Sequence, residues 1–282
     1  LKIAILSYRS APFGGGQGIY VYELSKTLKQ LGHQVDIISG PPYPELIPGI
    51  KLIKLPGLNL FSTFKFRDRL DLFLNKKNKS FDDWYEFSST LLGGFPELQT
   101  FGNRAHSYLL DKTYDVVIDN QSISYGAVKI QDSFPLVEMM HHPISKDYYY
   151  DLKFAKGILQ RISKIRWYSF LKMQKISAKK INVIVTPSVN SKADIHIDFK
   201  VPMENIQVIP NGIDCDIFCP LPHILSKKHR LITTASADVP LKGLDFLLEA
   251  IARLKPEYPD IHLMVIGSPR KEGHTERLIK KL

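Results

Sequence analysis

The 282-residue sequence lacks several features that mark whole classes of protein. Its two cysteines, Cys215 and Cys219, have no second pair that would complete a zinc site or a disulfide framework, and this indicates a reducing compartment without a bound metal. No apolar run approaches the roughly 20 residues needed to cross a bilayer. Because a strand pattern starts almost at Leu1, no signal peptide is expected. The sequence therefore predicts a cytoplasmic protein.

Acidic residues are missing from one long stretch, residues 152–193, which contains ten Lys and Arg residues. The chain has 38 basic and 28 acidic residues, so these ten account for the whole net charge of +10. One long helix is predicted over residues 147–180, with an apolar face and a basic side. Two interpretations stay open, a helix packed on the core or peripheral attachment to an anionic membrane. Nucleic-acid binding is not expected, because no base-stacking loops accompany the charges.

What the sequence does contain is an alternation of short apolar runs with amphipathic stretches. The runs with strand character are residues 2–7, 34–39, 50–55, 116–120, 136–140, 183–186 and 206–209. Helical spacing is found over residues 19–31, 81–92 and 98–110, besides the basic stretch. Strands that alternate with helices form a parallel sheet covered on both faces. The predicted fold class is therefore α/β.

A second, smaller domain is predicted after a segment rich in proline. Strand patterns at residues 231–235 and 261–266 flank a helix over 243–254, and another helix begins at Thr275. The predicted domains are residues 1–222 and 223–282. Because one βαβ unit and part of a helix make a small core, the second domain is predicted to be incomplete.

A glycine-rich turn, Phe-Gly-Gly-Gly-Gln-Gly at residues 13–18, links the first strand to the first helix. Glycines let the backbone approach a phosphate, and the helix N-terminus supplies unpaired N–H groups and partial positive charge. The dinucleotide fingerprint is absent, because Ile19 or Val21 holds the place of its third glycine. A phosphate-bearing ligand other than NAD is expected, and a tight turn without a ligand is the alternative.

Polar side chains follow two later strands. His141 and His142 come directly after the strand at residues 136–140, and Asn120 and Gln121 end the strand at 116–120. Ligands of open parallel sheets bind at the carboxyl ends of the strands. A histidine there can bind a sugar hydroxyl or a phosphate, or act as acid or base. For all four residues a capping or turn-forming role is the competing interpretation.

The second domain repeats a phosphate-friendly arrangement. Lys242 and Gly243 follow the strand at residues 231–235 and open a helix, which places a cation beside a helix N-terminus. A solvated lysine is the alternative. One such site in each of two α/β units predicts a phosphate ligand in a cleft between the domains.

Taken in order, these segments resemble the retaining glycosyltransferases of the GT-B fold, family 4. The resemblance covers the chain from Ile3 onward, and each segment is weak alone. The matching segments are Gly-Gly-Gly-Gln at 14–17, Gly-His-Gln-Val at 32–35, His141, Val-Thr-Pro-Ser at 185–188, Val-Ile-Pro-Asn-Gly-Ile-Asp at 208–214, Phe218, Pro220 and Lys-Gly-Leu-Asp at 242–245.

The resemblance implies two Rossmann-like domains that use a nucleotide-sugar donor, a UDP- or GDP-sugar, with no metal and no resident cofactor. Gly15 and Gly16 would approach the donor diphosphate, and His141 would be the catalytic contact near the reacting sugar carbon. Lys242 would neutralise the departing diphosphate, because a fixed cation stabilises charge that develops there.

The acceptor side is less defined by the sequence. Asn120, Gln121 and His142 are the candidates for acceptor binding, and the acceptor is expected to be a glycan or a glycolipid, as in cell-envelope polysaccharide synthesis. The anionic inner face of the membrane is an expected partner, and nucleic acid is not.

Two departures from the family pattern bear on activity. Ser236 stands where family members commonly place an arginine that contacts the donor diphosphate, and the glutamate pair of the family's second domain is not found in this sequence. The 282-residue chain is therefore predicted to be inactive by itself. A non-catalytic GT-B relative that binds a sugar or a partner is the alternative.

Overall fold

The computed structural model describes residues 1–12, 15–63, 65–225, 227–234, 242–267 and 272–282. The chain divides into two compact units, Leu1–Asn211 and Gly212–Leu282. The sequence-based boundary between residues 222 and 223 lies inside the second unit by this division. The described residues between 209 and 229 form no helix or strand, so this whole segment connects the two units.

The first unit is built on a seven-stranded sheet in which all the pairings are parallel, as predicted. In spatial order its strands are β3 (Lys51–Lys54), β2 (Gln34–Ser39), β1 (Lys2–Ser7), β4 (Val116–Asn120), β5 (Leu136–Met139), β6 (Ile184–Thr186) and β7 (Ile206–Val208). The order reverses between β1 and β4, and the carboxyl ends of strands at such a switch point form the usual ligand crevice of open α/β sheets.

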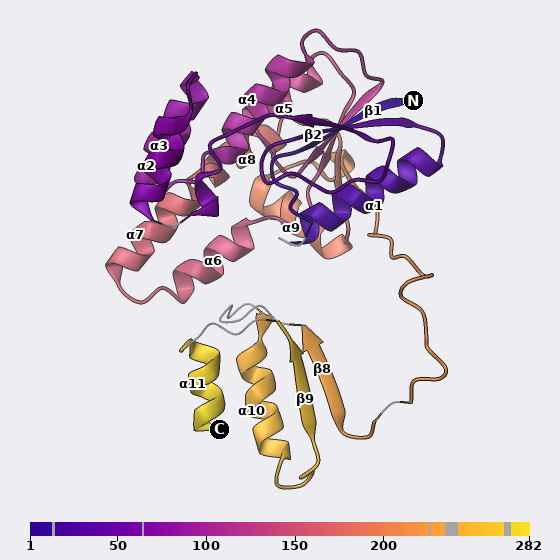
Figure 1. The fold of residues 1–282 in the computed structure, drawn as a ribbon, viewed down its shortest axis with the longest axis vertical. Helices are drawn as coiled ribbons and strands as arrows, with labels where there is room; N and C mark the ends of the chain where they lie inside the picture. Colours follow the sequence, from indigo (N-terminus) through magenta and orange to yellow (C-terminus); the bar gives the residue numbers. More distant parts are fainter. Residues whose placement is uncertain (13–14, 64, 226, 235–241, 268–271) are drawn as a thin grey trace. The chain divides into compact units, whose positions relative to one another are not determined.

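Helices cover both faces of this sheet (Figure 1). Ile3 and Ile5 of β1 pack in one cluster with Val21 of α1 (Gly16–Gln30). Because neighbouring side chains of a strand point to opposite faces, Leu6 belongs to the other cluster, with Phe101 of α4. Outside the basic stretch, the other helices of this unit are α2 (Phe66–Asn75), α3 (Phe81–Leu91), α4 (Glu97–Leu109), α5 (Tyr125–Gln131), α9 (Val189–Phe199) and the short 3-10 helices η1 (Leu60–Ser62) and η3 (Met203–Asn205).

The basic stretch folds differently from the prediction, and the single helix expected over residues 147–180 is wrong. It forms α6 (Ser145–Lys153), α7 (Ile158–Trp167), the 3-10 helix η2 (Tyr168–Phe170) and α8 (Leu171–Ala178). Gly157, with φ of 88°, starts a new helical direction after α6, because this backbone conformation favours glycine. Helix α8 buries Leu171 and Met173, whereas α7 has no buried residue.

The second unit contains a two-stranded parallel sheet, β8 (Arg230–Thr234) with β9 (His262–Ile266), and the helices α10 (Leu244–Leu254) and α11 (His274–Lys281). Leu244 and Ile261 are its buried hydrophobic residues among those described, while Ile232 and Ile266 are more than half exposed. The small core expected from the sequence is therefore observed. In neither unit does the described chain contain a helix long and apolar enough to cross a membrane.

Helices α4 and α5 approach each other through two glycines. A Cβ atom built on Gly126 would lie 2.1 Å from the carbonyl oxygen of Gly102, which is backbone and cannot turn away. The contact brings α5 onto α4 behind the carboxyl end of β4, so this packing supports the segment that carries Asn120.

Replacing Gly126 by alanine should destabilise the protein by about 1–3 kcal/mol, because the added methyl group forces two backbones apart. Urea unfolding measures this free energy. Gly212→Ala is the matched control, since a Cβ there meets nothing within 4 Å, and it should stay within about 0.5 kcal/mol of wild type. Equal stabilities of the two variants would contradict the close α4–α5 contact.

Candidate active site

Three strand ends are joined by one chain of hydrogen bonds. The Nε2 atom of His141, just after β5, lies 2.8 Å from Oδ1 of Asn120 at the end of β4. The Asn120 side-chain nitrogen donates to Oγ of Ser7 at the end of β1, at 3.4 Å, and Ser10 donates its hydroxyl to Ser7. The predicted site residues Asn120 and His141 are therefore brought together at the switch point of the sheet.

The His141 ring is held in a largely buried, uncharged state. The ring packs against Tyr20 of α1 in a T-shaped arrangement, with ring centroids 4.5 Å apart. Burial, with a smaller contribution from nearby His142, lowers the pKa of His141 to about 4. At neutral pH the ring donates Nε2–H to Asn120, which leaves Nδ1 as a hydrogen-bond acceptor. This geometry suits binding of a sugar hydroxyl and does not suit a general acid.

Gln121 fixes the main chain that carries both histidines. Its side-chain oxygen accepts from the backbone N–H of His141 at 3.1 Å, and its side-chain nitrogen donates to the carbonyl of His142 at 3.3 Å. His142 is exposed, and its Nε2 lies 3.1 Å from a carboxylate oxygen of Asp147 in α6. Asn120 and Gln121 are both buried. The contacts give them a positioning role, and their binding of an acceptor stays a prediction.

Two carboxyl groups are buried beneath these residues. Asp119 and Glu138 are adjacent partners in the β4–β5 register. Burial raises the pKa of both groups, and the charge of Asp119 adds to the effect on Glu138. Since two buried carboxylates side by side cannot both ionise, the pair keeps at least one proton at neutral pH. Ser122 donates to Asp119 at 2.5 Å, which ties the pair to the loop after Gln121.

The glycine-rich turn lies at the start of α1. Gly15 has a φ of 138°, a conformation available only to glycine, and a Cβ on Gly16 would meet nothing within 4 Å. The first turn of α1 has no acidic residue, and no described side chain caps its first N–H groups. A hollow of about 300 Å³ adjoins the turn, lined by Tyr8, Arg9, Ala11, Gly15, Gly16, Gln17, Gly18 and Pro42. Gly14 lies outside the described residues.

Comparison with known proteins identifies the family of the chain. The sequence profile of Glycosyltransferase Family 4 matches residues 14–217. A protein of Mycolicibacterium hassiacum named MMP alpha-(1->4)-mannosyltransferase is 40% identical over 286 residues, which cover 100% of this chain and 68% of that protein. The chain belongs to glycosyltransferase family 4. It is a transferase of the class that moves a sugar from a donor to an acceptor.

Solved structures confirm the GT-B fold of this family 4 member. TarM superposes with a TM-score of 0.61 at 12% identity, over 99% of this chain and 74% of that one. The catalytic domain of starch synthase IV from Arabidopsis thaliana, bound to ADP and acarbose, superposes with a TM-score of 0.56 at 14% identity, over 100% of this chain and 70% of that one. The chain thus spans about two thirds to three quarters of the length of these relatives.

Of the donor-binding residues predicted for the transferase in its second unit, one is described. Lys242 is exposed and directly precedes Gly243, which has a left-handed φ of 69° and caps α10. The predicted arrangement of a lysine beside a helix N-terminus is therefore present. Ser236 lies outside the described residues.

Arg9 is a cation of the transferase that the sequence reasoning missed. It lies two residues beyond β1 and lines the hollow at the glycine-rich turn. Its guanidinium contacts the carboxylate of Glu97 at 3.0 Å. Arg9 could have been found from the sequence, because it follows the carboxyl end of a strand, and the histidines and Asn120 were selected by that same position.

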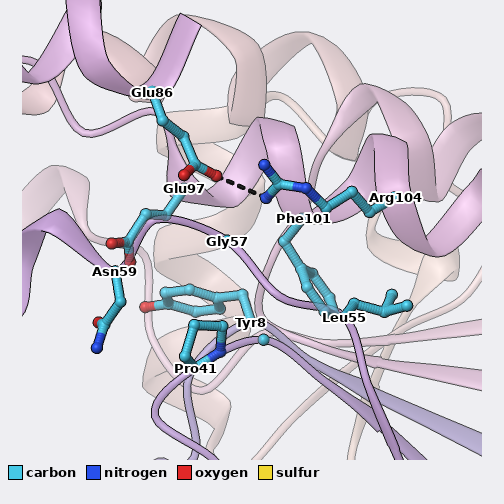
Figure 2. Close-up of a pocket in the computed structure, with 10 residues that line it drawn as sticks. Tyr8, Pro41, Leu55, Gly57, Asn59, Glu86, Glu97, Phe101 and Arg104 are labelled. Carbon is cyan, nitrogen blue, oxygen red and sulfur yellow. Dashed lines mark hydrogen bonds and ion pairs between the residues drawn. The ribbon is translucent and has the colours of Figure 1, made fainter. Parts of the chain in front are cut away.

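Glu97 faces a small cavity of about 10 Å³, room for about one water molecule. Figure 2 shows it there with Tyr8, Asn59 and Glu86, the last bound to Arg104. Glu86 is fully engaged, because it also accepts from the Thr100 hydroxyl at 2.6 Å. Burial outweighs the attraction of Arg9 and raises the pKa of Glu97 to about 7.

The raised pKa of Glu97 predicts a pH-dependent stability. A carboxyl that titrates near 7 when folded and near 4.5 when unfolded stabilises the fold most at low pH, and that contribution disappears as pH rises through 7. Wild type should therefore lose up to about 3 kcal/mol relative to Glu97→Gln between about pH 5 and pH 8.

Urea unfolding at both pH values measures the difference. Glu23→Gln is the matched control, since this glutamate pairs with Lys26 on the surface, and its difference from wild type should vary little with pH. Parallel pH profiles for wild type and Glu97→Gln would contradict the assigned pKa.

Proposed function

We propose that the full-length protein transfers mannose from a nucleotide-sugar donor, a UDP- or GDP-sugar, to a saccharide acceptor, with retention of anomeric configuration and formation of an α-(1→4) linkage. The observation that carries the proposal is the 40% identity with the named mannosyltransferase along the whole of this chain. Because the matched relative is longer than the chain, the activity is proposed for the full-length protein.

The site residues support this proposal in distinct ways. The uncapped N-terminus of α1, with Gly15 and Gly16, favours a diphosphate near the switch point of the sheet. His141 offers a neutral acceptor for a sugar hydroxyl. In the reaction the bond from the sugar anomeric carbon to the diphosphate breaks, the acceptor oxygen bonds to the same carbon, and the acceptor proton passes to the departing diphosphate. Lys242 stabilises the charge that builds on the diphosphate.

The experiment is an assay of the full-length protein with a panel of UDP- and GDP-sugars and mannose oligosaccharides. Mass spectrometry detects the added hexose, and NMR of the product reports the linkage and anomeric configuration. Transfer of mannose into an α-linked product is expected. Donor binding without any transfer would favour the non-catalytic alternative, and a β-linked product from an α-linked donor would overturn retention.

His141→Ala should lower the turnover number by roughly 10²–10³-fold, because a preorganised polar contact near developing charge is worth that much. Donor affinity should change much less. Steady-state kinetics and calorimetric titration separate the two effects. His33→Ala is the control, since His33 precedes β2 at the opposite edge of the sheet. Unchanged turnover in a folded His141→Ala variant would remove His141 from the mechanism.

Lys242→Ala should weaken binding of free nucleoside diphosphate by roughly 10-fold or more, because a charge-assisted contact is worth about 1.5–3 kcal/mol. Ser236→Arg should strengthen it for the same reason. Calorimetric titration of the full-length protein measures both, with Lys255→Ala as the control at the other end of α10. An arginine at position 236 that leaves the affinity unchanged would contradict its assignment to the donor site.

We also propose that the enzyme acts at the cytoplasmic face of an anionic membrane, on a glycolipid acceptor or a growing envelope polysaccharide. The excess of basic residues between 152 and 193 supports this location, because juxtamembrane lysines and arginines are attracted to anionic lipid headgroups.

A further inference from the structure

Helices α6 and α7 are held together as a hairpin by Asp151, in the last turn of α6, which contacts the second half of α7 and the residue that follows it. The Nζ atom of Lys164 in α7 lies 2.6 Å from the carboxylate of Asp151 in α6, and the Tyr168 hydroxyl donates to the same carboxylate at 3.1 Å. At the end of α7, Trp167 stacks on Phe95, with ring centroids 5.1 Å apart. The opposite end, residues 154–159, holds the connection between the two helices and the first turn of α7 (Figure 1).

That opposite end exposes large apolar side chains to solvent. Leu159 is 81% exposed, Ile158 68% and Phe154 57%. Ile162 and Ile165 continue the row at helical spacing, and both are also exposed. A helix face of this kind normally packs against a core, yet α7 has no buried residue. The uncovered face predicts an apolar partner.

Cations surround the same end of the hairpin. Lys153 and Lys156 are exposed, and among the described residues no acidic side chain lies within ion-pair distance of them. Arg161 donates to the carbonyl of Leu152 and keeps its charge. The hairpin carries two carboxylates, both in α6: Asp147 contacts His142, and Asp151 is paired with Lys164. The apolar face therefore lies within a field of positive charge.

We propose that the α6–α7 hairpin docks on an anionic lipid bilayer, with residues 154–159 entering the interface and Lys153, Lys156 and Arg161 contacting headgroups. An apolar face flanked by lysine and arginine is the pattern of helices that lie in a membrane interface. Aliphatic side chains such as Leu159 are stabilised by burial among acyl chains, whereas the phosphates of a nucleic acid offer them no apolar contact. The tyrosines 149 and 150 of α6, both exposed, suit the headgroup level.

The location of the hairpin ties it to the sugar-transfer site. Helix α6 begins four residues after His141, and Ser145 at its start donates to Asp198 of α9 at 2.6 Å. His142 contacts Asp147 in the first turn of α6. A docked hairpin therefore holds the carboxyl end of β5 close to the bilayer, where a lipid-linked acceptor resides. The docking itself does not depend on which sugar is transferred.

The structure also selects the residues to change. Lys172 and Lys175 belong to α8, whose Leu171 and Met173 are packed in the core. The docking surface is therefore limited to α6, α7 and their connection. Two full-length variants remove its two components separately: Ile158→Ser with Leu159→Ser for the apolar tip, and Lys153→Gln, Lys156→Gln and Arg161→Gln together for the charge.

The experiment is co-sedimentation of the full-length protein with vesicles of phosphatidylcholine, with and without phosphatidylglycerol, over a series of salt concentrations. Wild type should bind only vesicles that contain phosphatidylglycerol, and less as salt rises. The charge variant should bind roughly 100-fold more weakly, since each basic residue near the surface contributes about fivefold. The apolar variant should lose binding at all salt concentrations. A Leu159→Trp variant should shift its fluorescence to the blue on these vesicles.

Matched controls change the same residue types elsewhere. Leu31→Ser with Leu110→Ser removes two exposed leucines far along the chain from the hairpin, and Lys51→Gln, Lys228→Gln and Lys280→Gln remove three charges; both controls should bind like wild type. Equal binding to neutral vesicles, no binding to either, or loss of binding in the controls would overturn the proposal. Dimerisation in solution that the hairpin variants abolish, or binding of nucleic acid by residues 154–159, would also overturn the proposal. Sugar transfer to a soluble acceptor by both variants would separate failure of docking from failure of the proposed function.

Discussion

The parallel pairing of β1 with β4 is the constraint on which the site depends. It joins residues more than a hundred positions apart, Ile3 with Val116 through Leu6 with Asp119, and all carboxyl ends then meet at one edge. The order of strands reverses at this pair, so the connections after β1 and β4 turn to opposite faces and leave a crevice. Without this pairing the glycine-rich turn and the histidine segment would share no surface.

Ser7, Asn120, Gln121 and His141 are hydrogen-bonded within the site, and these bonds compensate for the burial of their polar groups. An unpaired buried polar atom costs about 1–3 kcal/mol, whereas Ser7, Asn120 and Gln121 each have a partner that belongs to the site. The same network orients His141, and burial keeps its ring neutral, before any ligand arrives. Because these side chains are already ordered when the protein folds, no free energy is needed to order them during the reaction.

The two parts of the basic stretch have similar compositions but pack differently. Its second part, α8, presents Leu171 and Met173 to the sheet and keeps its lysines in solvent, which is the ordinary amphipathic solution. Its first part, α7, has a comparable apolar row that no described residue covers. The difference arises at Gly157 and at Tyr168, where the chain changes direction. Two short helices can then face different environments, whereas one continuous helix could not.

The sequence alone determined the α/β class, the parallel sheet and the family. The alternation of strands and helices and the order of the motifs can be read along the chain without knowledge of tertiary contacts. The sequence also placed His141 and Asn120 at strand ends. It could not show that these two side chains bond to each other, that burial lowers the pKa of His141, or that Arg9 lies opposite Glu97, since each depends on strands and helices distant in the chain. Likewise, the apolar periodicity of residues 158–165 marked a face, but only tertiary packing decided that the face is left uncovered.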